Sequence, residues 1–235
     1  MNMDLTTEQQ QVILTGIFGD GCIAKPISAT SNCHYNTNCK YKEYIDFKEK
    51  LLGDLKCTQK YVAKNGYSQT PINLLSTSVH KDIRTINELS LQDALNLLTD
   101  LGVALWFYDD GSLHKRGYFY NLNTHAFSKE VQETLFIPFF NKLNIFPTMA
   151  MDRKKDGRVF HYMRINIHNG AFEINSLLRK FPVECYKYKL WSDEYYQNYK
   201  FLKDQNLSKE QILTHFKKLS GCKNWETRRA KEKLV

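Results

Sequence analysis

Apolar and polar residues occur in the same order twice along the chain. In the first half, the pattern predicts an apolar helix over residues 7–18, with the run 12–14 and Ile17 on its buried side. The helix is expected to stop at Gly19-Asp20-Gly21, where glycine permits a turn into extended chain. The elements expected next are extended chain over 22–38, a helix over 41–52, and a hairpin of 57–64 and 72–78 that turns at Asn65-Gly66.

The second half repeats this order. An apolar helix is expected over 91–108, again followed by an aspartate-glycine turn, Asp109-Asp110-Gly111. After it we expect extended chain over 113–124, a helix from its cap Ser128 to about 143, a hairpin of 146–154 and 158–167 around Asp156-Gly157, and a short helix over 171–181. Helix, two strands, helix, two strands, helix in both halves predicts a two-fold pseudo-symmetric α+β protein.

The chain divides into a first repeat over 1–88, a second over 89–190 and an extension over 191–235. Proline, glycine and serine are too sparse for a long linker, so the repeats should pack tightly. The extension should contain helices over 193–203 and 209–219. From residue 186 onward there are 12 basic and 6 acidic side chains. This excess of positive charge favours a non-specific DNA-binding arm only slightly over an ordinary solvated tail. The candidate DNA-contacting residues of the arm are Lys217, Lys218, Lys223, Arg228, Arg229 and Lys231.

Composition narrows the class of protein. Hydrophobic residues make up 42% of the 235 residues, which is typical of a globular protein. The net charge of +8 favours polyanionic partners. No apolar stretch reaches the length of a membrane span, and no secretion signal begins the sequence, so we expect no membrane partner and an intracellular location, cytoplasmic or organellar. The group Cys33-His34-Cys39 lacks a second zinc-binding half, so free thiols are expected.

The two aspartate-glycine turns carry the candidate chemistry. A single Asp-Gly turn after a helix is usually only a cap. Two of them, at Asp20 and Asp110 in matching repeats, are harder to explain in that way. If the two apolar helices pack in parallel, both carboxylates converge at helix ends that already carry partial negative charge. A divalent cation would offset that repulsion and provide a Lewis acid.

These segments resemble the two signature motifs of the LAGLIDADG homing endonucleases. The similarity lies in residues 11–21 (QVILTGIFGDG), in residues 98–113 (LTDLGVALWFYDDGSL) and in Tyr188-Lys189-Leu190. Thr15 stands where the family usually has glycine. The resemblance implies a monomer with two αββαββα repeats, paired motif helices at their interface and two saddle-shaped antiparallel sheets that straddle double-stranded DNA. It also implies metal-dependent cleavage of both strands of a long, specific site, with short 3′ overhangs.

The resemblance assigns roles to individual residues. Asp20 and Asp110 would bind Mg²⁺, for which Mn²⁺ or Ca²⁺ could substitute, and Gly19 and Asp109 precede them in the metal centre, Asp109 as a turn or supporting residue. Lys189 is the candidate catalytic cation of the second repeat. Arg84 aligns best with that position in the first repeat, although arginine is a poor proton acceptor. The two active sites would therefore be unequal.

DNA contacts are expected on the strands. Alternation over 158–166 places arginine, asparagine and aromatic side chains on one face, which suits base edges in the major groove, while basic residues of the adjoining hairpin suit phosphates. The alternative for each residue is an ordinary solvent-exposed face. The candidates are Arg158, Tyr162, Arg164, Asn166, Arg153, Lys154 and Lys155 in the second repeat, and Lys25, Asn32, His34, Asn36, Lys60, Lys64 and Asn73 in the first.

Two other functions remain open at the level of sequence. The same scaffold could serve an RNA-splicing maturase, with intron RNA as partner, or a non-cleaving DNA-binding regulator. A third possibility is an unrelated basic α+β protein with fortuitous Asp-Gly turns. Retention of both acids favours cleavage.

Overall fold

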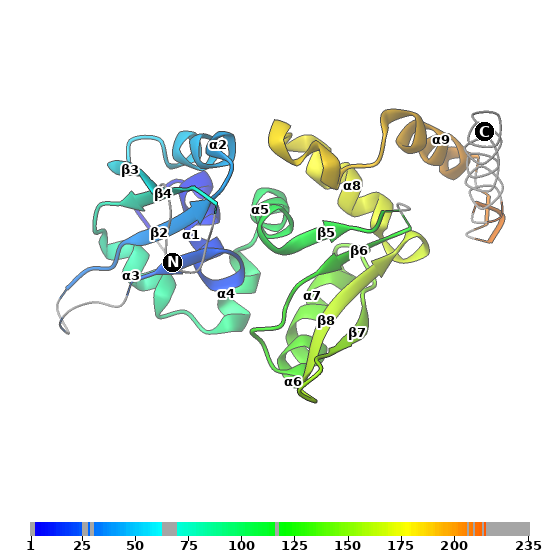
Figure 1. Cartoon of the computed structure of the whole chain (residues 1–235), viewed down its shortest axis with the longest axis horizontal. Coiled ribbons are helices and arrows are strands. Elements are labelled where there is room, and N and C mark those ends of the chain that lie inside the picture. Colours follow the sequence, from blue (N-terminus) through cyan, green and yellow to red (C-terminus); the bar gives the residue numbers. More distant parts are fainter. Residues whose placement is uncertain are drawn as a thin grey trace.

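A computed structural model of the chain describes residues 3–24, 28, 31–62, 70–115, 118–205, 207–208, 210–212 and 214. It contains two αββαββα repeats, as the sequence pattern predicts (Figure 1). The first repeat consists of α1 (Thr7–Phe18), β1 (Gly21–Ile23), β2 (Tyr35–Cys39), α2 (Lys42–Leu52), β3 (Cys57–Val62), β4 (Ile72–Thr77) and α3 (Lys81–Asn87).

The second repeat has the same plan. It consists of α5 (Asp100–Asp110), β5 (Gly111–Leu113), β6 (Phe119–Leu122), a helical stretch made of α6 (Lys129–Val131), the π-helical turn η1 (Gln132–Phe136) and α7 (Ile137–Lys142), then β7 (Thr148–Arg153), β8 (Val159–Asn166), the 3₁₀ turn η2 (Ile167–Asn169) and α8 (Ala171–Lys180). In addition to the elements of this plan, the second repeat begins with α4 (Leu91–Leu97) and ends with the 3₁₀ turn η3 (Glu184–Lys189), and α9 (Asp193–Asp204) follows it.

Each repeat builds one four-stranded antiparallel sheet. The strand orders are β1-β2-β4-β3 and β5-β6-β8-β7, so the two sheets have the same topology. The first strand of the first sheet begins at Gly21, which pairs with Thr37. The first strand of the second sheet begins at Gly111, which pairs with Leu122. Because these glycines directly follow Asp20 and Asp110, each sheet starts one residue after a candidate metal ligand.

Helices α1 and α5 pack against each other in parallel between the two halves of the molecule (Figure 1). Near their N-terminal parts, the side chain of Gln11 lies against Gly102. Near their C-terminal ends, the rings of Phe18 and Trp106 lie 4.9 Å apart. The interface therefore joins the equivalent ends of the two motif helices, the arrangement that makes their carboxylates converge.

The prediction of one continuous helix over 91–108 was wrong. Leu98 adopts an extended conformation that separates α4 from α5. Gln11 stabilises this break from across the interface, because its amide donates to the Leu97 carbonyl at 3.0 Å and its oxygen accepts from the Thr99 N–H at 2.8 Å. These bonds satisfy backbone groups that a continuous helix would have paired internally.

Two small residues of α1, Thr15 and Gly16, contact the sheet of their own repeat. Thr15 is buried and its hydroxyl lies 2.6 Å from the hydroxyl of Tyr35 in β2. A Cβ added to Gly16 would lie 2.8 Å from the side chain of Ile23 in β1. Both residues thus bring α1 close to the sheet of its own repeat.

Helix α3 closes the first repeat, as the repeated pattern of elements implies, although the sequence did not indicate its residue range. The described cysteines, 22, 33, 39, 57 and 185, are free thiols as expected. None of the described helices combines the length and apolar character that a membrane crossing requires. The proposed basic arm and most of the helix expected over 209–219 lie outside the described residues.

Candidate metal centre and nucleic-acid interface

The structure brings Asp20 and Asp110 together at the C-terminal ends of α1 and α5. Asp110 is the last residue of α5, and Asp20 follows α1 after Gly19. Burial, followed by the charges of Asp20 and Asp109, raises the pKa of Asp110 to about 7. Burial and the charge of Asp109 also raise the pKa of Asp20. The centre therefore disfavours a second ionised carboxylate unless a cation neutralises it.

This arrangement fits a hard divalent cation. Two crowded carboxylates at helix C-termini provide the oxygen ligands and negative charge that such a cation needs. Within the described part of the chain, no group of three or more His, Cys, Asp or Glu side chains is arranged to hold a metal ion. A metal held by Asp20 and Asp110 would thus keep coordination positions for other oxygen ligands, as a catalytic rather than a structural site does.

Asp109 is not placed to share that metal, which corrects its assignment to the ligand set. Its side chain is only 1% exposed, and it forms an ion pair with Lys48 of α2 at 3.0 Å. Its carboxylate also accepts a hydrogen bond of 2.7 Å from the Tyr44 hydroxyl. Gly19, its equivalent in the first motif, has no side chain to offer, and a Cβ there would lie 2.5 Å from Asp109 Oδ2. These two residues pack the centre and do not complete its coordination.

Lys48 is a functional candidate that sequence reasoning missed. Its side chain is completely buried, and Nζ lies 3.0 and 3.1 Å from the two oxygens of Asp109. Burial alone would lower the pKa of Lys48, but the charge of Asp109 raises it above its ordinary value. One signal in the sequence could have found it: Lys48 occupies the same helix face as Tyr44, Ile45 and Leu52, which are all buried.

Lys189 lies at the centre, where the motif resemblance put it. Its Nζ donates to the carbonyl of Tyr108 at 2.6 Å and to that of Phe107 at 3.3 Å, so it caps the end of α5. Burial lowers its pKa to about 8, against the opposing effect of Asp109, Asp20 and Asp110. With a pKa of about 8, Lys189 is still mainly protonated at neutral pH, and its positive charge acts on both candidate ligands.

Arg84 does not reach the centre. It lies on α3, where its Nε donates to Glu88 at 2.7 Å and its Nη1 to the carbonyl of Ser31 at 3.4 Å. The cations whose charges act on Asp20 and Asp110 are Lys48 and Lys189. Alignment along the chain selected Arg84, but its side chain contacts Glu88 and Ser31 and is not among the charges that act on the two aspartates, so the assignment was wrong.

The open face of the second sheet carries the polar and aromatic residues expected there. Met163 and Ile165 of β8 are buried, whereas Tyr162, Arg164 and Asn166 point to the other side. Arg164 is held in place: Nη2 donates to the Tyr162 hydroxyl at 2.8 Å and Nε to Asn121 Oδ1 at 3.2 Å. Its guanidinium also lies 4.4 Å from the centre of the Phe119 ring. A fixed guanidinium on an open sheet face suits recognition of a base edge.

The first sheet presents a comparable face. Cys33, Tyr35 and Thr37 are buried, so Asn32, His34 and Asn36 alternate outward, and Asn38, which the sequence reasoning missed, extends the same row. Lys60 joins this face, since β3 and β4 place it opposite Leu74, which in turn pairs with Asn38.

Asn73 points to the opposite, inner face of the first sheet, so it is no longer a candidate for DNA contacts. The register of β4 places it with Leu75 and Thr77, and its amide donates to the carbonyls of Cys39 and Lys40, each at 3.2 Å. Lys25 and Lys64 lie outside the described residues.

The hairpin between β7 and β8 is exposed and basic. Lys154 pairs with Asp152 and Arg158 with Asp156, each at 2.7 Å, while Arg153 and Lys155 are exposed as well. These pairs are solvent-exposed, so they are weak and can be exchanged for phosphate contacts.

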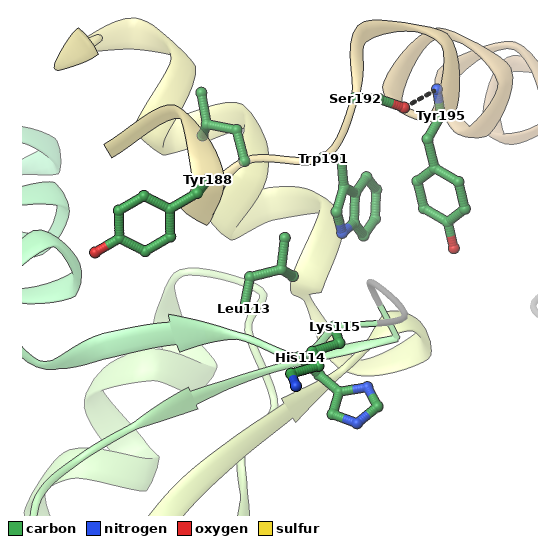
Figure 2. Close-up of a pocket in the computed structure, with 8 residues that line it drawn as sticks. Leu113, His114, Lys115, Tyr188, Trp191, Ser192 and Tyr195 are labelled. Carbon is green, nitrogen blue, oxygen red and sulfur yellow. Dashed lines mark hydrogen bonds between the residues drawn. The ribbon is translucent and has the colours of Figure 1, made fainter. Parts of the chain in front are cut away.

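A hollow of about 440 Å³ lies beside the Tyr188-Lys189-Leu190 element. Figure 2 shows Leu113, the last residue of β5, pointing toward Tyr188 and Trp191, with His114 and Lys115 next to each other below it. Lys189 does not line this hollow, because it points instead into the end of α5. The hollow is therefore separate from the carboxylate centre.

Comparison with known proteins agrees with this geometry. The family model of the LAGLIDADG DNA endonuclease family matches residues 10–174, which include most of α1, all of α5 and both sheets. The chain belongs to that family. A shorter match, 24% identical over 121 residues, is to Protein RecA of Mycobacterium gastri, and it spans 48% of this chain but only 28% of that protein.

Solved homing endonucleases share the fold. A structure of I-WcaI bound to its DNA recognition sequence matches with a TM-score of 0.64 at 20% identity, over 81% of this chain and 88% of that one. Mesophilic variants of I-DmoI match with a TM-score of 0.51 at 15% identity, over 76% of this chain and 98% of theirs. The expected fold, with two repeats and two four-stranded sheets, is thereby confirmed.

Proposed function

We propose that this member of the DNA endonuclease family is a site-specific homing endonuclease that hydrolyses both strands of a long duplex target with a divalent metal and leaves short 3′ overhangs. One observation carries the proposal: Asp20 and Asp110 converge where two sheets with polar open faces begin. A DNA duplex lying along those faces would bring its backbone to the two carboxylates.

Related structures support the choice of partner and cofactor. I-WcaI is described bound to its DNA recognition sequence, and I-DmoI variants are described with target DNA in the presence of manganese or magnesium. We extend this to double-stranded DNA and Mg²⁺ here. Both repeats lie in a single chain, which makes a monomer sufficient. An intracellular enzyme with access to DNA is the corresponding expectation for location.

Asp20 and Asp110 would hold the metal. When bound, it supplies a Lewis acid that eases deprotonation of water and neutralises charge at the phosphate. The chain itself contributes the remaining electrostatics. Lys189, next to both carboxylates, would stabilise the negative charge that develops at phosphorus. Lys48 offsets the third carboxylate, Asp109, and so keeps the charge at the centre close to that of the two ligands.

DNA recognition would come from the two open faces. Arg164, Tyr162 and Asn166 in the second sheet are candidates for base contacts, as are Asn32, His34, Asn36 and Asn38 in the first. Arg153, Lys154 and Lys155 are candidates for phosphate contacts. Arg158, expected from sequence on the base-reading face, joins them, because it precedes β8 and lies in the exposed hairpin, paired with Asp156.

A library of DNA duplexes incubated with the protein and Mg²⁺ tests the proposal. We expect a single family of related sites to be cut on both strands, with cutting abolished by chelation and by the double variant Asp20→Asn, Asp110→Asn. Absence of double-strand cutting in every target would defeat the proposal. Splicing of an intron RNA without DNA cutting would support the maturase instead, and full activity of the double variant would show that the centre lies elsewhere.

A further inference from the structure

The carboxylate of Asp109 is buried among donors that come from the first repeat. Oδ1 accepts from the Tyr44 hydroxyl at 2.7 Å and from Lys48 Nζ at 3.0 Å. Oδ2 accepts from Lys48 at 3.1 Å and from the backbone N–H of Asp20 at 3.3 Å. Asp109 itself belongs to α5 of the second repeat. Its side chain therefore crosses the interface between the repeats and ends against the backbone of a candidate metal ligand.

Lys48 is fixed in turn by the first sheet. Its Nζ lies 3.3 Å from Thr37 Oγ1 and 3.4 Å from the Tyr35 hydroxyl, both on β2, and 4.7 Å from the centre of the Tyr44 ring. A buried ammonium with this many contacts has little freedom to move. Asp109 is thus anchored to the body of the first repeat and not merely to a flexible side chain.

The equivalent position of the first motif complements this contact. Gly19 leaves the space that Asp109 fills, since an added Cβ would lie 2.5 Å from Oδ2 and 2.9 Å from the Cβ of Asp109. One repeat therefore has a carboxylate where the other has no side chain. The two-fold symmetry of the motifs is broken at the residue directly before each metal ligand.

The two ligands are held by different means as a result. Asp110 closes α5, whose last carbonyls are capped by Lys189. Asp20 lies beyond the end of α1 and its backbone is tied to the other repeat. We infer that Asp109, anchored by Lys48 and Tyr44, is a positioning residue that fixes Asp20. The two metal ligands of the cleavage centre are therefore held in place by different contacts.

This inference rests on the proposed function for its catalytic consequence. Loss of the Asp109 contact displaces Asp20 and leaves Asp110 in place, so it affects the two strand cuts to different extents. Displacement of a catalytic group by about 1 Å costs on the order of 100-fold in rate. We therefore expect the ratio of the two strand-cutting rates to change by about 10-fold or more, with nicked duplex accumulating.

The test uses the double variant Lys48→Met, Asp109→Leu, because apolar replacement of both partners avoids leaving a buried charge unpaired. Asp109→Asn is the single-site companion. Gln11→Leu is the matched control, since Gln11 bridges the same two helices at their other end through Leu97 and Thr99. Thermal unfolding shows that each variant is folded and how much stability it has lost.

Two readouts decide the outcome. Amide hydrogen exchange should accelerate by about 10-fold or more at Asp20 in the double variant and stay unchanged at Asp110, whereas Gln11→Leu should alter neither. On a duplex with separately labelled strands, only the Lys48 and Asp109 variants should shift the ratio of strand rates. Equal changes at Asp20 and Asp110, or an unchanged rate ratio in a variant that cuts, would overturn the inference. If the protein cuts no DNA, the proposed function fails, and amide exchange still decides the positioning role.

Discussion

The Nζ of Lys189 donates a hydrogen bond of 2.6 Å to the backbone carbonyl of Tyr108, 81 residues earlier in the chain and two residues before Asp110. The contact places one ammonium group at the negative end of α5 and next to both candidate metal ligands. It connects the end of the second repeat to the carboxylate centre.

Replacement of Lys189 by methionine should therefore impair both catalysis and stability. Removing one stabilising donor from an active site costs about 100-fold in rate. Leaving the Tyr108 carbonyl without this donor should lower the free energy of unfolding by about 1–2 kcal/mol. Single-turnover cleavage and urea unfolding measure the two effects. Lys189→Arg keeps the charge and should retain more activity than the methionine variant; wild-type rates in Lys189→Met would contradict the assigned role.

Removal of the Asp110 charge should stabilise the metal-free protein while abolishing cleavage. The pKa of Asp110 is raised to about 7, so the folded protein binds this proton more tightly than the unfolded chain does. The stability that this proton binding contributes is fully present below the unfolded pKa, near 4, and is lost as the pH rises through 7. At pH 8, Asp110→Asn should gain about 1–2 kcal/mol, less than the full shift implies because the carboxylate is partly solvated. Unfolding at pH 5 and pH 8 checks this: the gain should shrink at pH 5, and an equal gain at both values would contradict it.

Metal affinity should rise with pH up to about 7. A proton on Asp110 competes with the cation, so below pH 7 the apparent affinity should increase by about tenfold per pH unit and then level off. Calorimetric titration of the DNA complex with Ca²⁺ between pH 5.5 and pH 8 measures the slope. A flat profile over that range would show that Asp110 does not bind the cation or that it is already ionised.

Arg164 should determine preference at one base pair. Its guanidinium is held by Tyr162, Asn121 and the Phe119 ring, so it can present its remaining N–H groups without a large entropic cost. Arg164→Ala should weaken binding of the preferred target by about 1–3 kcal/mol and relax selectivity at a single position. Competition binding against all single-base variants measures both.

Arg158 provides the matched control for that experiment. It lies in the exposed hairpin, paired with Asp156. Arg158→Ala should weaken binding to all sequences alike and reduce the dependence of affinity on salt, as expected for a phosphate contact. If Arg164→Ala behaves in the same uniform way, its role in base recognition is wrong.

The positions of Asp20 and Asp110 could be predicted because the information is local. An apolar run followed by Asp-Gly predicts both the helix and the residue at which it ends. The repetition of that pattern indicates that the two helices share an interface. The outward face of β8 was predictable for the same reason, since strand alternation fixes it without knowledge of any neighbour.

The positive charges of the centre could only partly be predicted. Lys189 lies in a recognisable sequence motif. The role of Lys48, in contrast, depends on Asp109, which lies 61 residues away in the other repeat. Arg84 was chosen by its place along the chain. Its pair with Glu88 is an i, i+4 contact that the sequence could have indicated, whereas its contact with Ser31 depends on the fold. Buried ion pairs are set by tertiary packing, which single-sequence patterns do not encode.

Gln11 illustrates the same limit for the backbone. Residues 91–108 have the periodicity of one helix, and the interruption at Leu98 depends on an amide supplied by α1. A side chain from another element can thus replace intrahelical hydrogen bonds and set a boundary that propensity does not indicate.

Anomalous diffraction from crystals of the protein bound to its selected DNA target and soaked with Mn²⁺ tests the central claim most directly. The structure predicts manganese density within coordination distance of both Asp20 and Asp110, beside a phosphate of the DNA, and its loss in the double variant Asp20→Asn, Asp110→Asn. Ordered manganese at another carboxylate group, or a fully bound duplex with no manganese near these two residues, would contradict the assignment of this centre.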